Sequence, residues 1–145
     1  MDGYDNLRNG IVRQAAEDYA AAFMGNAVGG KDADRMMREC EAFFHSEWYE
    51  ALTNGAVDGK WLAKQIKIRE LEKVENAYDA ILNLCNRTTL KAAVVFPRAK
   101  NRETPKPMTY IFPPRFAEYL MDALRIQRES IKAKIRELKS TEVRI

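Results

Sequence analysis

The stretch FFHSEWYEALTNGAVDGKWL, residues 43–62, contains the start and the end of one predicted helix and the start of the next. Ser46 is typical of a helix N-cap, and the acidic Glu47 that follows is favoured at the positive end of the helix dipole. Asn54-Gly55 predicts a helix stop, and Asp58-Gly59 predicts the start of another helix. The stretch therefore predicts a short helix over residues 46–53 and a long helix that begins at residue 59.

Upstream of this stretch, apolar residues recur at steps of three and four. This spacing is typical of amphipathic helices and predicts two of them, over residues 4–24 and 32–45. The glycine pair Gly29-Gly30 separates the two, because glycine tolerates turn conformations that other residues avoid. Asp32 or Asp34 is expected to cap the second helix.

Downstream, the long helix is predicted over residues 59–86. The segments 90–96 and 108–112 are short, β-branched and aromatic, which indicates a β-hairpin with a long, proline-bearing connection. A last helix over 114–139 is expected to bury Phe116, Leu120, Leu124, Ile131, Ile135 and Leu138. The predicted fold class is α+β, mainly helical, and the length of 145 residues favours a single domain over residues 1–145.

The stretch of residues 43–62 also contains a cluster of aromatic residues. We expect it to form a packed core where two helices cross, because aromatic side chains dominate core burial. An exposed tryptophan would instead indicate an interaction surface. A helix-turn-helix over residues 46–62 is a weaker alternative, since its turn exceeds the usual three or four residues. The cluster consists of Phe43, Phe44, Trp48, Tyr49 and Trp61.

Charge is divided unevenly along the chain. Residues 1–85 carry 10 lysines and arginines against 15 acidic residues, whereas residues 86–145 carry 14 against 6. The net charges of −5 and +8 give the overall +3. This division indicates that the C-terminal part faces an anionic partner, or pairs with the acidic part of the same chain or of a second copy, so a homodimer is an open alternative.

The predicted binding surface is the connection of the hairpin together with the last helix. Arg98, Lys100 and Arg102 alternate, so in an extended backbone they would project to one side. Clustered cations on a protruding ribbon suit contact with phosphate or acidic groups. Charges that only prevent edge-to-edge pairing, and charge pairs along the helix, are the alternative explanations. The full predicted set is Arg98, Lys100, Arg102, Lys106, Tyr110, Arg115, Arg125 and Arg128.

The sequence offers little for catalysis, and we expect no enzymatic activity. His45 is the only histidine, and Cys40 and Cys85 have neither a CxxC spacing nor a spaced histidine partner. Phosphate-binding glycine motifs are absent. We therefore predict no catalytic residues, no metal site and no cofactor.

Composition favours a globular protein of the cytoplasm. Hydrophobic residues make up 46% of the chain, yet its apolar runs are shorter than the roughly 20 residues of a membrane span. The acidic, polar start, residues 1–5, is not typical of a signal peptide. We expect no membrane partner and reduced cysteines.

Part of the sequence resembles small uncharacterised proteins encoded by phages and prophages of Firmicutes. The resemblance lies in residues ~10–70 and is carried by EAFFHSEWY (41–49), Leu52-Thr53, DGKWL (58–62) and AAEDY (15–19). It implies a small phage accessory protein acting in the cytoplasm of the host cell. Such proteins are often inhibitors of host defence, including anti-CRISPR proteins, or helpers of phage DNA metabolism.

The leading hypothesis is a non-enzymatic phage accessory protein. It would bind and inhibit, or sequester, a host defence component, either a protein or a ribonucleoprotein, through the basic connection and last helix. The alternatives are a nucleic-acid-binding factor of phage replication or transcription, and an oligomeric sponge for an anionic nucleotide signal. Phosphates and acidic side chains attract the same cations, so the sequence leaves these open.

Overall fold

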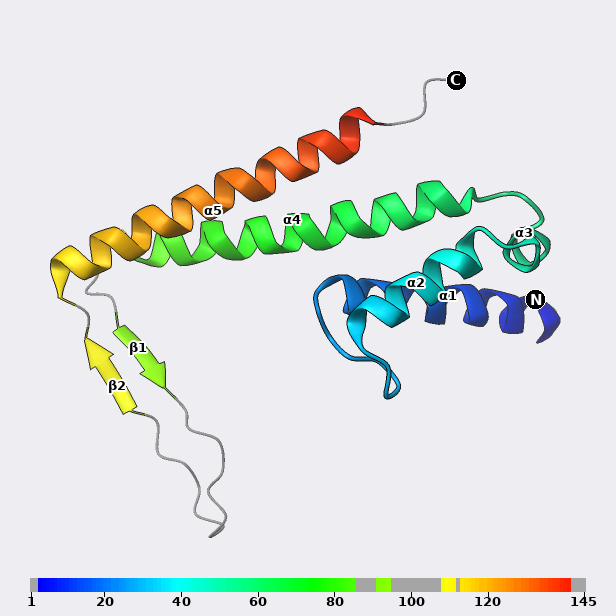
Figure 1. The fold of residues 1–145 in the computed structure, drawn as a ribbon, viewed down its shortest axis with the longest axis horizontal. Coiled ribbons are helices and arrows are strands. Elements are labelled where there is room, and N and C mark those ends of the chain that lie inside the picture. Colours follow the sequence, from blue (N-terminus) through cyan, green and yellow to red (C-terminus); the bar gives the residue numbers. More distant parts are fainter. Residues whose placement is uncertain (1–2, 86–90, 95–107, 112, 142–145) are drawn as a thin grey trace, which may run out of the picture. The chain divides into compact units, whose positions relative to one another are not determined.

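The computed structural model describes residues 3–85, 91–94, 108–111 and 113–141, and these residues are mainly helical (Figure 1). The helices found in this part of the chain are α1 (Gly3–Phe23), α2 (Ala33–Phe44), α3 (Glu47–Thr53), α4 (Gly59–Cys85) and α5 (Pro114–Ser140). Two short strands, β1 (Lys91–Val94) and β2 (Met108–Ile111), pair antiparallel with Lys91 opposite Ile111.

The five predicted helices are confirmed, and their ends lie within one residue of the predicted ones. The predicted hairpin of residues 90–96 and 108–112 includes residues outside the described ranges, and it stays a prediction. The contacts of the chain divide into two units, Met1–Lys73 with Lys134–Ile145, and Val74–Ala133. The assignment of residues 1–145 to a single domain also stays a prediction.

Capping residues explain why the ends of the helices could be predicted from the sequence. Asp32 accepts a hydrogen bond from the Arg35 amide at 2.7 Å, and Ser46 accepts one from the Tyr49 amide at 3.1 Å. At the end of α3, Asn54 adopts the left-handed conformation, with φ 53° and ψ 31°. These groups satisfy backbone donors and redirect the chain where a helix would otherwise leave them unpaired.

The chain between α1 and α2 makes a tight turn. The amides and carbonyls of Val28 and Lys31 exchange two hydrogen bonds of 3.0 Å across Gly29 and Gly30, whose φ angles are 58° and 78°. Two successive positive φ angles favour glycine because it lacks a Cβ. The turn brings α2 back against α1, as Figure 1 shows.

The first unit has a core built around Tyr19, which is completely buried. Its ring meets the Phe44 ring edge-on at 5.6 Å, and its hydroxyl donates a 2.8 Å hydrogen bond to Glu41 Oε1. Arg8 on α1 donates to the carbonyl of Leu52 at 3.1 Å, near the end of α3. The buried members of this core are Tyr19, Ala22, Met36, Cys40, Phe44, Tyr49 and Ala63.

In the second unit, the part of α4 from Val74 onward lies beside α5 (Figure 1). Leu82 and Met121 are buried, and Arg128 on α5 reaches Asp79 on α4 at 3.1 Å. One sequence expectation is wrong here: Phe116 was expected in the core but exposes 50% of its surface. Arg128, one of the predicted binding residues, lies seven residues from Met121, on the same helical face.

Candidate functional site

Much of the predicted basic surface lies outside the described residues. This holds for Arg98, Lys100, Arg102 and Lys106, while Tyr110 lies in β2 and its side chain is not among those described. The described part consists of Arg115, Arg125 and Arg128 on α5.

On α5, two of these three arginines are paired with carboxylates. Arg125 contacts Asp122 at 2.9 Å, one helical turn away, and Arg128 contacts Asp79 at 3.1 Å. The Nε of Arg128 is buried without a hydrogen bond, so this side chain belongs to the packing between α4 and α5 in the second unit. Arg115 is exposed and makes no ion pair with the described residues.

The aromatic cluster within residues 43–62 is divided between core and surface. Phe44 and Tyr49 are each only 2% exposed, which confirms the predicted core. Trp48 and Trp61 expose 58% and 51% of their surface, so the prediction of a core position is wrong for both. On a short helix, Trp48 is turned by about 100° from its neighbour Tyr49, and both cannot face the same core.

Trp48 borders an apolar groove between α1 and α2. The ring of Phe43 meets the Trp48 ring edge-on, with centroids 5.4 Å apart. The groove has a volume of about 370 Å³. Its apolar lining consists of Ile11 and Ala15 from α1, Met36, Cys40 and Phe43 from α2, and Trp48 from α3.

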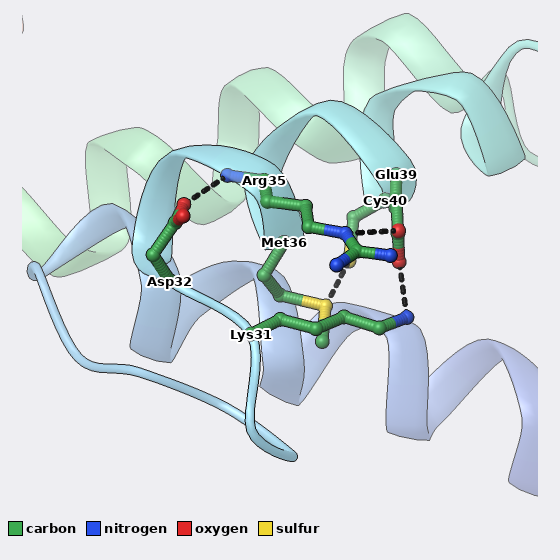
Figure 2. Close-up of polar contacts among 6 residues, drawn as sticks. All are labelled: Lys31, Asp32, Arg35, Met36, Glu39 and Cys40. Carbon is green, nitrogen blue, oxygen red and sulfur yellow. Dashed lines mark hydrogen bonds and ion pairs between the residues drawn. The ribbon is translucent and has the colours of Figure 1, made fainter.

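Helical spacing explains why these apolar side chains meet. Ile11 and Ala15 are four residues apart, and so are Met36 and Cys40, so each pair shares one helix face. The Cys40 thiol lies 3.6 Å from the Met36 sulfur, and Figure 2 shows this contact between the two side chains. Burial raises the pKa of the Cys40 thiol, and the neighbouring Asp18 and Glu39 act in the same direction. The thiol therefore stays protonated and contributes to packing.

The rim of the groove is polar and carries two carboxylates. Figure 2 shows Glu39 held between Lys31 and Arg35; the Arg35 Nε lies 3.1 Å from Glu39 Oε1. The hydrogen bond from Lys31 is the main cause that lowers the pKa of the Glu39 carboxyl. On the opposite side, Asp18 accepts a 2.8 Å hydrogen bond from Gln14, a neutral donor. Among the described residues Asp18 has no cationic partner, so the rim keeps uncompensated negative charge at this point.

A second, polar pocket of about 340 Å³ lies at the start of α4 and includes His45, Tyr49, Asp58 and Lys60. Asp58 caps α4 by accepting from the Trp61 amide at 3.2 Å. The Tyr49 hydroxyl is buried without a hydrogen-bond partner. Burial, and secondarily Asp58, raises its pKa, so this hydroxyl stays protonated.

In residues 3–85, 91–94, 108–111 and 113–141, no three histidine, cysteine or acidic side chains are grouped as metal ligands would be. No described helix combines the length and apolar character required to cross a membrane.

The chain was also compared with known proteins. No protein-family model matches it, and neither the curated proteins nor the solved structures include a significant match. The candidate site is therefore described from the structure of this chain alone.

Sequence reasoning identified Trp48 but assigned it to the core. The signal for its exposure was present: Tyr49, Leu52 and Thr53 follow one another at steps of three and one, so they form the inner face of α3 and leave Trp48 outside it. The groove itself depends on how α1 and α2 pack, which no local pattern specifies.

Proposed function

We propose that this protein acts by binding a protein partner without catalysing a reaction, and that the Trp48 groove is its binding surface. The observation that carries the proposal is a tryptophan, 58% exposed, at the edge of an apolar groove. Tryptophan is enriched among the interface residues that contribute most of the binding energy. It makes this contribution when the partner covers its side chain completely.

The shape of the groove supports an amphipathic helix as the bound segment. Two antiparallel-connected helices with an apolar floor between them can accept apolar residues spaced at i, i+3/i+4 and i+7 from a third helix. The uncompensated Asp18 on the rim favours a segment that carries a lysine or arginine beside its apolar residues. The partner is therefore expected to present a basic amphipathic helix.

The finer proposal concerns the identity of the partner. Following the resemblance to phage-encoded proteins, we propose that the protein is a phage accessory protein and that the target is a component of a host defence system, inhibited in the cytoplasm of the host cell. In this proposal the basic residues Arg98, Lys100, Arg102 and Lys106 form a second contact, since their charge suits an acidic or phosphate-bearing part of the same target.

A photo-cross-linking amino acid at the groove tests the proposal. Gln14, on the rim, and Asn76, an exposed polar residue on α4, provide matched positions. We expect a protein to be cross-linked in bacterial cells from position 14 but not from position 76, and Trp48→Ala to abolish the cross-link. Equal cross-linking from both positions, or a cross-link that persists in Trp48→Ala, would contradict the proposal.

Reversing the three alternating charges (Arg98→Glu, Lys100→Glu, Arg102→Glu) separates the two surfaces. If the basic residues form a second contact, binding of the cross-linked partner weakens while the melting temperature stays nearly unchanged.

A nucleic-acid-binding factor is the second candidate function, and the +8 charge of residues 86–145 favours it. This candidate predicts binding to DNA or RNA that falls steeply with salt. Trp48→Ala would leave that nucleic-acid binding unchanged.

A further inference from the structure

Helix α5 has apolar side chains on two faces within the second unit. Met121 is buried on the inner face. Phe116, Tyr119 and Ile126 expose 50%, 66% and 67% of their surface, and Ala123 between them is also exposed. We call Phe116, Tyr119, Ala123 and Ile126 the outer stripe.

The spacing of the outer stripe is that of a helix–helix seam. Its members follow one another at steps of three, four and three residues, the alternation of a and d positions in a heptad repeat. At about 100° per residue, the centre of the stripe lies on the side of α5 opposite Met121. A helix that is apolar on two opposite faces is expected to be buried on both.

The amount of exposed apolar surface is large for a single helix. Three large side chains exposed by half to two thirds provide on the order of 300–400 Å² of apolar surface, and large exposed apolar patches mark interaction sites. With the flanking side chains, two such faces approach the roughly 1,000 Å² that a specific interface buries in total.

The stripe is complementary to itself when two copies run antiparallel. Phe116 and Ile126 are equally distant from the midpoint of the stripe, as are Tyr119 and Ala123, so a two-fold axis at the midpoint places Phe116 opposite Ile126 of the second copy. The same axis places the large Tyr119 opposite the small Ala123. A parallel pair would instead set tyrosine against tyrosine and alanine against alanine, which packs less well.

The charges beside the stripe follow the same symmetry. Arg115 and Glu129 flank the two ends of the stripe on the same side, so each arginine of an antiparallel pair faces a glutamate of the other copy. Among the described residues, Glu129 makes long contacts of 3.7 Å to Arg128 and Lys132. Asp122 lies near the axis, where the two copies of this carboxylate would approach each other, and Arg125 compensates it at 2.9 Å.

From this self-complementarity we infer that a second copy of the chain docks on the outer stripe, so that the protein forms an antiparallel α5–α5 homodimer. The apolar residues of the stripe supply most of the affinity, and the two Arg115–Glu129 pairs fix the antiparallel register. The dimer surface consists of residues of α5, whereas the Trp48 groove consists of residues of α1, α2 and α3 together with the polar rim.

Analytical ultracentrifugation over a range of concentrations measures the dimer directly. We expect a monomer–dimer equilibrium for the full chain and at least about a 100-fold increase in its Kd for the double variant Tyr119→Glu, Ile126→Glu, because charges replace two apolar contacts. Leu7→Glu on α1, where the side chain is 61% exposed, is the matched control and should leave the Kd unchanged. Circular dichroism and melting temperature verify that each variant is folded.

Charge exchange tests the register. Arg115→Glu and Glu129→Arg should each raise the Kd several-fold, and combining them should restore it, since the pair is re-formed with opposite polarity. A monomer at every concentration, or a dimer that Tyr119→Glu, Ile126→Glu leaves intact, would overturn the proposal. A double exchange that does not restore the Kd would overturn the antiparallel arrangement.

Discussion

Trp48 and Tyr49 are adjacent in sequence and opposite in environment, with 58% and 2% of their surfaces exposed. Residue type alone predicted the same core position for both, because large aromatic side chains are usually buried. The seven-residue length of α3 decides otherwise, since so short a helix can bury one face only. The prediction of burial was therefore correct for Tyr49, which lies on the inner face of α3, and wrong for Trp48.

Tyr19 gives a prediction for high pH. Burial, and then the hydrogen bond to Glu41, raises the pKa of the Tyr19 hydroxyl above its ordinary value near 10. The unfolded chain thus ionises this tyrosine first, so its stabilising effect is complete below pH 10 and is lost as the pH rises further. We expect a fall of up to ~1.4 kcal/mol per pH unit in the free energy of unfolding above pH 10 from this residue.

Urea unfolding of the wild type and of Tyr19→Phe, from neutral pH to about 11, measures this effect. At neutral pH the variant should lose about 1 kcal/mol, because Glu41 loses a hydrogen-bond donor. Above pH 10 the two free energies should converge. If their difference stays constant across the whole range, the titration of Tyr19 does not contribute.

At the scale of elements, the helices were predictable and their packing was not. Caps such as Asp32 and Ser46 act locally, so they can be read from the sequence, and the structure shows both in place. The second apolar face of α5 was not predicted, because Phe116 was assigned to the core face and the basic residues of the helix were interpreted as a binding surface. The steps from Phe116 to Tyr119, Ala123 and Ile126 carried that signal in the sequence.

The approach of α4 to α2 depends on Gly59. A Cβ at this position would lie 1.9 Å from the Phe44 carbonyl oxygen, a backbone atom that cannot move alone. Gly59→Ala is expected to destabilise the protein by about 1–3 kcal/mol, as overpacking does. Gly10→Ala is the control, because nothing lies within 4 Å of its added Cβ and alanine favours helix by about 0.5–1 kcal/mol.

Chemical denaturation of the two alanine variants checks this prediction. Opposite changes in the free energy of unfolding, a loss for Gly59→Ala and a small gain for Gly10→Ala, are expected. A Gly59→Ala variant as stable as the wild type would show that α4 can begin farther from α2 without cost.

At the scale of the whole molecule, the uneven charge and the exposed apolar surfaces are the features on which the proposed binding and the proposed dimer rest. The acidic residues 1–85 include the Trp48 groove, and the basic residues 86–145 include the outer stripe of α5. The sequence predicted a binding protein and placed its surface on basic residues. On α5, Arg125 and Arg128 turn out to be paired with Asp122 and Asp79, whereas the Trp48 groove arises only when α1, α2 and α3 pack together.

The affinity of the cross-linked partner for two tryptophan variants tests the central claim most directly. Trp48 borders the groove, whereas Trp61, 51% exposed, does not line it. Titration calorimetry with the purified partner should show Trp48→Ala weakening the Kd by about 30-fold or more, the effect of losing ~2 kcal/mol, and Trp61→Ala changing it less than about twofold. A Kd unchanged in Trp48→Ala, or weakened equally by both substitutions, would contradict binding through this groove.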